Sequence, residues 1–525
     1  MALSFHQPNM NPTQSLNRIT LSLACCLVTT TMALSPGLAA AQTADSPEIR
    51  TPSAPPTPRI NGPAIFGVRP DHPFLYHIPA TGNRPMQFSV KKLPAGLTLN
   101  PNTGDITGVI HKAGQYKVTF HAKNALGADH KKFVIVVGET IDLTPAMGWN
   151  SWNHYASRIT QDLVLQNAKA MADSGLINHG WSYINIDDTW QGARGGQFHG
   201  LLGNEKFPDL KGMCDTIHGM GLKFGIYSTP WVTSYAGFPG GSAENPEGTW
   251  TKSVGKTVKN KNILPCAIAQ YHFTTNDADQ WAAWGVDYLK YDWNPIELPE
   301  TQEMADALRH SGRDIVFSLS NNMNITNGAT IGKVANSWRT TGDIKANWTS
   351  MSQRGFGQDK WRPYSSPGHW NDPDMLEIAT KERNQPGLTP AEEYTHMTLW
   401  CLLGAPLLLA NDLSDMDAFT HNLLENDEVL AVSQDSRGDQ AVEIARDGEA
   451  RVYAKKLEDG SEAVGLFNTG TNGTLTVTVK WSDLKISEKR VVRDLWRQKD
   501  LGKFTDKFEL PVAPHSAELV KISKK

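Results

Sequence analysis

Hydrophobic and polar positions change their spacing twice along the chain. Between residues 63 and 138, short β-type runs alternate with turn signals such as Asn102-Thr103-Gly104-Asp105. The runs cover residues 75–78, 86–90, 116–122 and 132–137. This spacing predicts a small antiparallel β-sandwich over residues 59–139.

From residue 144 onward, short apolar runs alternate with amphipathic helical patterns. In one such helix Thr160 is the expected N-cap, Val164, Ala168 and Met171 fall on one face, and Gly175 is the expected stop. Eight candidate strands punctuate the region, at residues 146–149, 183–187, 222–227, 286–292, 314–319, 336–339, 369–371 and 407–410. Alternating strands and helices predict a parallel α/β fold, and eight strands predict a (β/α)8 TIM barrel over residues 140–434.

Beyond residue 435 the helical period disappears. Apolar runs at residues 463–467, 475–479 and 517–520 predict a C-terminal antiparallel β domain over residues 435–525. The fold class expected from these patterns is multidomain α/β, with an N-terminal β-sandwich, a central (β/α)8 barrel and a C-terminal antiparallel β-sandwich.

The first 41 residues have the pattern of a signal peptide. Arg18 precedes an apolar stretch over residues 19–34, and Ala39-Ala40-Ala41 stands before Gln42. The long polar start raises Met10 as an alternative initiator, and a lipoprotein-type cleavage before Cys25 fits only loosely. We therefore expect an exported protein, in the periplasm or the medium, with no membrane span. Proline-rich residues 42–58 are the expected linker to the first module.

The charge and the cysteine content limit the classes of binding partner that we expect. The 50 basic and 54 acidic residues give a formal net charge of −4, so no global field attracts nucleic acid or an anionic membrane. A neutral substrate is expected, and 16 Trp and 12 Tyr residues suit the C–H faces of sugars. The mature chain keeps Cys214, Cys266 and Cys401, which form neither a disulfide framework nor a CxxC metal site. We expect no cofactor, and the sequence leaves the oligomeric state open.

The chemistry concentrates where the expected barrel strands end, which is where barrel enzymes carry their active sites. Carboxylates, two cations, a serine and tryptophans occupy these positions: Trp149, Trp152, Asp187, Asp188, Lys290, Asp292, Ser320, Arg339, Asp343, Asp372 and Asp374. A lone Asp at a strand end is more often an N-cap for the next helix. A ring of carboxylates on several strand ends favours glycoside hydrolysis by paired carboxyl groups. His369 with Asp372 and Asp374 gives no recognisable zinc spacing, so no metal is expected.

The same positions carry a family resemblance. Five motifs in order resemble glycoside hydrolase family 27, the melibiase or α-galactosidase type: Thr144-Pro145-Ala146-Met147-Gly148-Trp149-Asn150-Ser151-Trp152, Tyr183-Ile184-Asn185-Ile186-Asp187-Asp188-Thr189-Trp190, Tyr288-Leu289-Lys290-Tyr291-Asp292, Trp338-Arg339-Thr340-Thr341-Gly342-Asp343 and Trp370-Asn371-Asp372-Pro373-Asp374-Met375. The N-terminal module resembles the immunoglobulin-like modules of secreted bacterial proteins.

The resemblance implies a retaining exo-glycosidase that removes terminal α-linked galactose. It makes Asp292 the nucleophile and Asp343 the general acid/base. Since Lys290 stands two residues before Asp292 on one strand face, we expect it to lower the pKa of Asp292. Asp343 is expected to have a raised pKa, because a general acid must hold its proton.

The resemblance also implies the substrate contacts. Asp187 and Asp188 would accept hydroxyls on carbons six and four of the sugar, and this pair would select galactose over glucose. Trp152 would supply a stacking wall. The other expected pocket residues are Tyr227, Lys290, Ser320, Arg339 and Asp374.

Three departures from the family pattern leave alternatives open. Ser320 lies in the segment where family members often carry Glu and where related α-N-acetylgalactosaminidases use Ser, so the substituent at carbon two is undecided. The positions of a disulfide in relatives are Tyr235 and Asn294 here. Residues 240–276 look like an insertion that could be a lid, a subsite wall or a solvated loop. The alternatives are an α-N-acetylgalactosaminidase, a β-L-arabinopyranosidase, or a non-catalytic carbohydrate-binding protein.

Overall fold

A computed structural model describes residues 48–251, 267–380 and 386–524 of the chain. The expected signal peptide, residues 42–47 of the expected linker, Cys266, and the lysine-bearing part of the expected insertion, residues 252–266, lie outside the described residues. Everything below concerns the described part of the chain. Among these residues no helix is long and apolar enough to cross a membrane.

The N-terminal module is built from antiparallel sheets, with one parallel pair. A four-stranded sheet has the order β2-β9-β8-β5, a three-stranded sheet the order β3-β7-β6, and β1 pairs with β4. The bounds are β1 Arg59–Ile60, β2 Ile65–Val68, β3 Pro73–His77, β4 Ala80–Thr81, β5 Gln87–Lys91, β6 Leu97–Leu99, β7 Asp105–Val109, β8 Gly114–Asn124 and β9 Gly127–Val137. Buried and accessible positions alternate along β9, as expected for a sheet with one face in the core. All four expected strands form, and Phe120 and Phe133 pack in the core between the sheets.

The central domain has the eight expected parallel strands, in the sheet order β20-β19-β18-β17-β14-β11-β10-β21. They are β10 Met147–Asn150, β11 Tyr183–Asn185, β14 Lys223–Ser228, β17 Tyr288–Asp292, β18 Val316–Ser320, β19 Ser337–Arg339, β20 Trp370–Asp372 and β21 Leu407–Leu409. Each observed strand lies within two residues of its expected ends. The terminal strands are joined through Leu376, whose N–H donates to Leu408 O and whose carbonyl accepts from Ala410 N. The prediction of a (β/α)8 barrel is confirmed.

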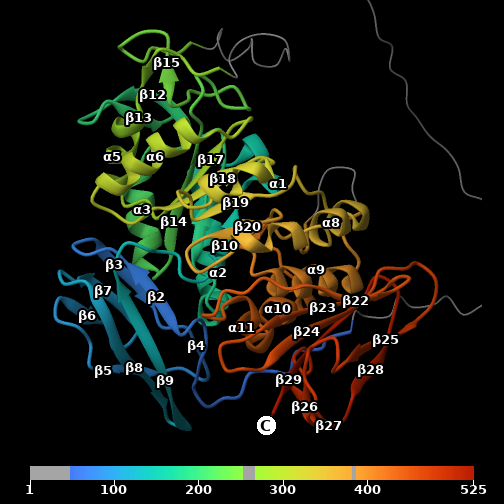
Figure 1. Ribbon diagram of the computed structural model, residues 1–525. Coiled ribbons are helices and arrows are strands. Elements are labelled where there is room, and N and C mark those ends of the chain that lie inside the picture. The colour runs from blue at the N-terminus through green and yellow to red at the C-terminus, as the bar shows by residue number, and fades with distance from the viewer. Residues whose placement is uncertain (1–47, 252–266, 381–385, 525) are drawn as a thin grey trace, which may run out of the picture. The chain divides into compact units, whose positions relative to one another are not determined.

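Helices and two small hairpins connect these strands (Figure 1). The helices are α1 Trp152–Tyr155, α2 Gln161–Asp173, α3 Leu210–Gly219, α5 Thr274–Trp284, α6 Leu298–His310, α7 Gly328–Ile331, α8 Trp348–Gly355, α9 Pro390–Leu403, α10 Ala418–Leu424 and α11 Asp427–Ser433. Short 3-10 helices cover Ala156–Arg158, Leu176–His179, Ile325–Asn327 and Asp359–Tyr364. The hairpins pair β12 Gln191–Gly195 with β13 Gly200–Gly203, and β15 Ser242–Ala243 with β16 Tyr271–His272.

Local sequence explains where the first long helix begins and ends. The Thr160 side chain accepts a hydrogen bond from Leu163 N at the start of α2, as an N-cap does. Gly175, with φ of 93°, follows its end in the left-handed conformation that glycine adopts without strain. Val164, Ala168 and Met171 are fully buried, so the expected face is the packed face.

The C-terminal domain, drawn in orange to red in Figure 1, is entirely antiparallel. A six-stranded sheet has the order β22-β23-β24-β29-β26-β27, and β25 pairs with β28. The bounds are β22 Val442–Asp447, β23 Ala450–Lys456, β24 Glu462–Asn468, β25 Leu475–Lys480, β26 Arg490–Asp494, β27 Lys499–Phe504, β28 Lys507–Val512 and β29 Ala517–Ser523. Residues from both sheets, such as Val464 and Val477, share one core, so the sheets form a sandwich.

Candidate active site

Polar side chains from five barrel strands, β10, β17, β18, β19 and β20, gather toward the carboxyl ends of those strands. One small cavity there is lined by Asn150, Tyr288, Lys290, Ser318, Ser320, Arg339, Asp372, Asp374, Met375 and Leu408. The structure therefore brings together four of the expected pocket residues: Lys290, Ser320, Arg339 and Asp374. Strand pairing explains part of this, because Asp292 lies opposite Ser320 and Arg339 opposite Asp372 in the parallel register.

Asp292 ends β17 with its carboxylate held on both oxygens. Along this strand Leu289 and Tyr291 pack into the large barrel core, so Lys290 and Asp292 share the opposite face. The Tyr227 hydroxyl donates to Asp292 Oδ2 at 3.1 Å, and Asn321 Nδ2 donates to Asp292 Oδ1. The residue is 8% exposed. A carboxylate fixed in this way has little freedom to rotate.

Lys290 makes its direct ion pair with Asp187 rather than with Asp292. Its ammonium lies 2.8 Å from Asp187 Oδ2, and both side chains are largely buried. Asn150 Nδ2 donates to the same Asp187 oxygen at 2.9 Å, while Ser151 Oγ accepts from the Asp187 backbone N–H at 3.0 Å. Although burial opposes it, the carboxylates of Asp187 and Asp292 raise the pKa of Lys290. Asp187 is thus oriented by two donors from different strands.

Asp188 is anchored by backbone donors. Its Oδ2 accepts from Ala236 N at 2.9 Å, and its Oδ1 accepts from Thr189 N at 2.6 Å. Burial raises the pKa of Asp188 to about 6, with the neighbouring Asp187 charge adding to the effect. Asp187 Oδ1 accepts from the Asp188 N–H at 2.8 Å, so the two carboxylates are fixed relative to each other.

Arg339 links the two carboxyl groups that follow β19 and β20. Its Nη2 lies 2.7 Å from Asp374 Oδ2 and 3.2 Å from Asp343 Oδ1. Asp374 is buried, whereas the Asp343 side chain is 87% exposed. Asp374 also accepts from Ile344 N at 2.7 Å, which holds the segment that carries Asp343. Asp343 therefore stands at the open edge of the site, and Asp292 lies within it.

In the substrate-free protein the expected direction is wrong for the pKa of Asp343, whereas Lys290 lowers the pKa of Asp292 as expected but is outweighed by burial. Burial raises the pKa of Asp292 to about 7, although Lys290, the Tyr227 hydroxyl and Arg339 lower it. Partial desolvation by the surrounding protein tends to raise the pKa of Asp343, but Arg339 and Lys290 lower it below its ordinary value. Burial prevails at Asp292, where the Lys290 ammonium contacts Asp187 instead, while Arg339 is in direct contact with Asp343.

The remaining expected contacts are less central. Trp152 begins α1, and its half-buried ring packs against a hydrophobic cluster that includes Tyr288, Met375 and Leu408. Trp149 and Trp338, which also stand in the motifs at the strand ends, are fully buried and belong to the core.

Sequence reasoning missed three residues that hold the site in place: Asn150, Ser151 and Asn321. Each ends or directly follows the observed strand β10 or β18 and lies within two residues of the expected strand end, and that position was the available signal. Backbone strain marks the same ends, because Thr189, Asn321 and Asp374 have φ values of 88°, 78° and 104°. Non-glycine residues in this region cost free energy and are often found at functional sites.

A metal ion requires a particular arrangement of the side chains that bind it. Within the described ranges, no group of three or more His, Cys, Asp or Glu side chains is arranged to hold a metal ion.

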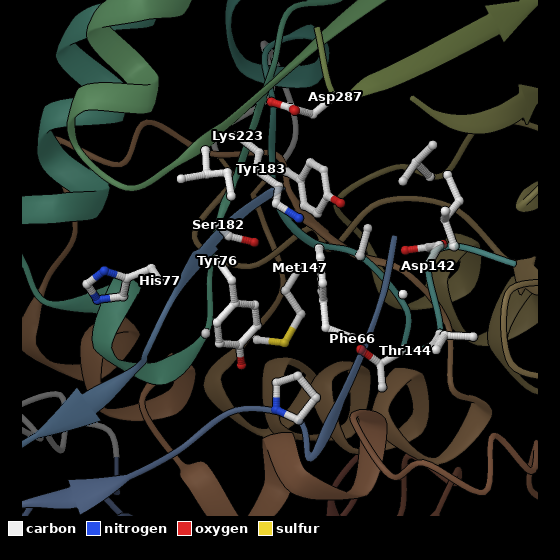
Figure 2. A pocket seen from close by; sticks show the side chains of 18 of the residues that line it. Phe66, Tyr76, His77, Asp142, Thr144, Met147, Ser182, Tyr183, Lys223 and Asp287 are labelled. Atoms are coloured by element: carbon white, nitrogen blue, oxygen red, sulfur yellow. The ribbon is translucent and has the colours of Figure 1, made fainter. Parts of the chain in front are cut away.

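A separate cavity, shown in Figure 2, lies at the amino ends of the barrel strands and is lined by both the N-terminal module and the barrel. Its labelled residues include Phe66, Tyr76, Asp142, Tyr183 and Lys223. It contains none of the expected site residues.

Sequence comparison assigns families to all three domains. Residues 144–250 and 256–435 match the model of alpha galactosidase A. Residues 447–522 match the alpha galactosidase C-terminal beta sandwich domain, and residues 57–138 match an Ig domain model.

Individual relatives agree with this assignment. Alpha-galactosidase 2 of Arabidopsis thaliana is 35% identical over 406 residues, which cover 76% of this chain and 94% of that protein. A solved structure from Bacteroides fragilis is 33% identical with a TM-score of 0.79, covering 89% of this chain and 98% of that one. The GH27 β-L-arabinopyranosidase of Geobacillus stearothermophilus is 29% identical with a TM-score of 0.60, covering 72% of this chain and 96% of that one. Because the family model spans more than half of the sequence and all the strand ends described above, the chain belongs to the alpha-galactosidase A family of glycoside hydrolases.

Proposed function

We propose that the protein is a retaining exo-α-galactosidase, with Asp292 as nucleophile and Asp343 as general acid/base. Family membership makes the chain a galactose-releasing glycosidase. The observation that carries the residue roles is the contrast between Asp292, enclosed and held on both oxygens, and Asp343, exposed on the same end of the barrel. A nucleophile must be fixed against the anomeric carbon, and an acid must reach the oxygen that leaves.

The reaction has two displacements. In the first, an Asp292 carboxylate oxygen bonds to the anomeric carbon while the glycosidic C–O bond breaks and Asp343 gives its proton to the departing oxygen. In the second, Asp343 takes a proton from water, the water oxygen bonds to the anomeric carbon, and the Asp292 ester bond breaks. The two inversions leave galactose in its α configuration. This chemistry needs the carboxyl groups roughly 5 to 5.5 Å apart.

The charge balance of the site suits a transition state with positive charge on the sugar. Asp372 and Asp374 line the cavity together with Lys290 and Arg339, while Asp187 pairs with Lys290 and Asp292 lies opposite Ser320 in the sheet. Fixed negative groups that face a developing oxocarbenium ion lower its energy without reorganising. Lys290 and Arg339 orient the carboxylates with which they pair.

We propose that Asp187 and Asp188 accept hydrogen bonds from the sugar hydroxyls on carbons six and four. The wrong epimer would leave a buried acceptor of this pair without the hydroxyl it is placed to receive, which costs more than one lost surface contact. Their fixed geometry supports this role, because Asn150 and the Ala236 N–H set the direction of their oxygens.

Two related sugars remain as alternatives at this site. Ser320 lines the cavity together with Lys290 and Arg339. Because related α-N-acetylgalactosaminidases use Ser in this segment, N-acetylgalactosamine is one alternative substrate. β-L-Arabinopyranose is the other alternative substrate, because the chain is similar to the arabinopyranosidase structure and that sugar has the same ring without carbon six.

A panel of aryl glycosides that differ only at carbons two, four and six tests the assignment. We expect the α-galactoside to be turned over fastest and the α-glucoside to be at least about 100-fold slower in kcat/KM, because its hydroxyl at carbon four cannot reach the same acceptors. Faster turnover of the N-acetylgalactosaminide or the arabinopyranoside would replace galactose as the substrate and leave the mechanism intact.

We also propose that the protein is exported and that its mature chain begins at Gln42. The charged, apolar and small-residue pattern of residues 1–41 supports this. Mass spectrometry of protein from the periplasm or the medium of the producing cell should show Gln42 as the first residue. A protein that stays inside the cell and keeps residues 1–41 would refute the proposal.

A further inference from the structure

The segment that follows β14 presents an exposed aromatic residue at the carboxyl end of the barrel. Tyr235 is 43% exposed, and its ring packs edge-on against Trp231 with centroids 5.0 Å apart. The next residue, Ala236, donates its N–H to Asp188. Tyr235 therefore stands in a segment already tied to the proposed substrate pocket.

Asn321 connects Tyr235 to the proposed nucleophile. Its Nδ2 donates to the Tyr235 hydroxyl oxygen at 3.2 Å and to Asp292 Oδ1. An amide nitrogen carries two N–H groups, so this arrangement uses both. Because an ionised carboxylate only accepts hydrogen bonds, the contact with Asp292 requires the nitrogen to face it.

The backbone of Asn321 indicates that this contact is held against strain. Its φ of 78° lies in the left-handed region, immediately after Ser320 ends β18. Asparagine tolerates that conformation better than most residues do. The conformation turns the chain at the position where the amide reaches Asp292.

We propose that Asn321 is a positioning residue for Asp292 and that Tyr235 acts through Asn321 by fixing its amide. The proposal rests on the proposed function, since it requires Asp292 to be the nucleophile. Asn321 fixes one carboxylate oxygen while Tyr227 fixes the other. A donor aimed at the ionised carboxylate also lowers its affinity for a proton, which counteracts its burial.

Three variants test this with α-galactosyl fluoride, whose leaving group needs little protonation, so that the rate reports nucleophilic attack. Asn321→Gly removes the amide and accommodates the positive φ, and Tyr235→Phe removes only the hydroxyl. Asn322→Ala is the matched control, because Asn322 is an exposed neighbour on the same segment. Melting curves establish that each variant is folded.

We expect Asn321→Gly to lower kcat about 10-fold or more, as loss of a hydrogen bond to a charged group does, with little change in KM. Tyr235→Phe should lower kcat by a smaller factor, and the double variant should equal Asn321→Gly, because Tyr235 acts through the amide. The acid limb of kcat/KM should move to higher pH in Asn321→Gly, a change that a merely structural role would not produce.

Additive losses from Tyr235→Phe and Asn321→Gly, or an acid limb that stays in place, would overturn the proposal. Wild-type rates in both folded variants would do the same. If the wild-type protein itself fails to hydrolyse α-galactosyl fluoride, the proposed function fails instead, so the two failures are distinct.

Discussion

Asp292 and Asp343 carry the same chemical group in very different surroundings. Asp292 is enclosed, and burial raises its pKa to about 7. Asp343 is exposed beside Arg339, and its pKa is lowered. In the empty site Asp292 therefore holds a proton more readily than Asp343 does, although catalysis needs the proton on Asp343. The productive form is the minor one, and such coupled groups titrate as a pair.

This arrangement predicts how activity depends on pH. For the wild-type protein, kcat/KM should fall as pH rises through about 7, because the pair then loses its only proton. In Asp343→Asn, assayed with α-galactosyl fluoride, no acid is needed, so kcat/KM should instead rise through about pH 7 as Asp292 ionises. Initial rates from pH 4 to 9 measure both profiles.

A profile of Asp343→Asn that is already flat from about pH 5 upward would show that Asp292 has an ordinary carboxyl pKa. Asp343→Asn assayed with a poor leaving group provides the control, because its rate should be low at every pH if Asp343 supplies the proton.

The contacts between individual side chains in the site were the hardest feature to predict from the sequence. The spacing of Lys290 and Asp292 correctly put both on one strand face, yet the lysine reaches Asp187 on another strand. The contact of Asn321 with Asp292 depends on a turn after β18 that no periodicity encodes. The resemblance supplied residue types at strand ends, whereas their pairing and exposure follow from three-dimensional packing.

Strands and helices were more predictable than side-chain contacts. Parallel strands covered on both sides read as continuous apolar runs, and strands such as β18 and β21 were predictable for that reason. The hairpins β12–β13 and β15–β16 were not foreseen. Their sequences are rich in glycine and polar residues, and β15–β16 joins residues about 30 positions apart across the expected insertion, so no local pattern marks them.

The N-terminus of α9 allows a test at this scale. The Thr389 side chain accepts from Glu392 N, and the Glu392 side chain accepts from Thr389 N, which forms a capping box. Thr389→Ala should lower the free energy of unfolding by about 1 kcal/mol, since it leaves orphan N–H groups at the start of a buried helix. Denaturant unfolding measures this loss. Serine at the same position should restore most of it, and kcat should be unchanged in both variants.

At the scale of the whole molecule, the N-terminal module and the barrel share buried ionisable groups. Asp314 in the barrel accepts from Arg69 N and pairs with His72, both in the module. In the cavity of Figure 2, Lys223 lies 4.2 Å from the centroid of the Phe66 ring. Burial raises the pKa of Asp142, which lines this cavity, to about 8, although Lys223 lowers it.

Asp142 should therefore make stability depend on pH. Because its pKa is higher in the folded than in the unfolded protein, the folded form binds the extra proton between about pH 4 and pH 8. Its contribution is complete below about pH 4 and is lost as pH rises through about 8. Asp142→Asn should raise Tm by about 2 °C or more at pH 8 and by little at pH 4. Calorimetry at the two pH values measures the difference, and a variant less stable than wild type at pH 8 would mean that an ionised Asp142 stabilises the fold.

The central claim is that Asp292 forms a covalent bond with galactose. Incubation with 5-fluoro-α-galactosyl fluoride, which forms the ester readily and releases it slowly, followed by proteolysis and mass spectrometry, tests it most directly. The account predicts one added fluorogalactosyl group, on the peptide that contains Asp292 and on that side chain. A label on another carboxyl group, or full turnover with an inverted first product and no label, would contradict it.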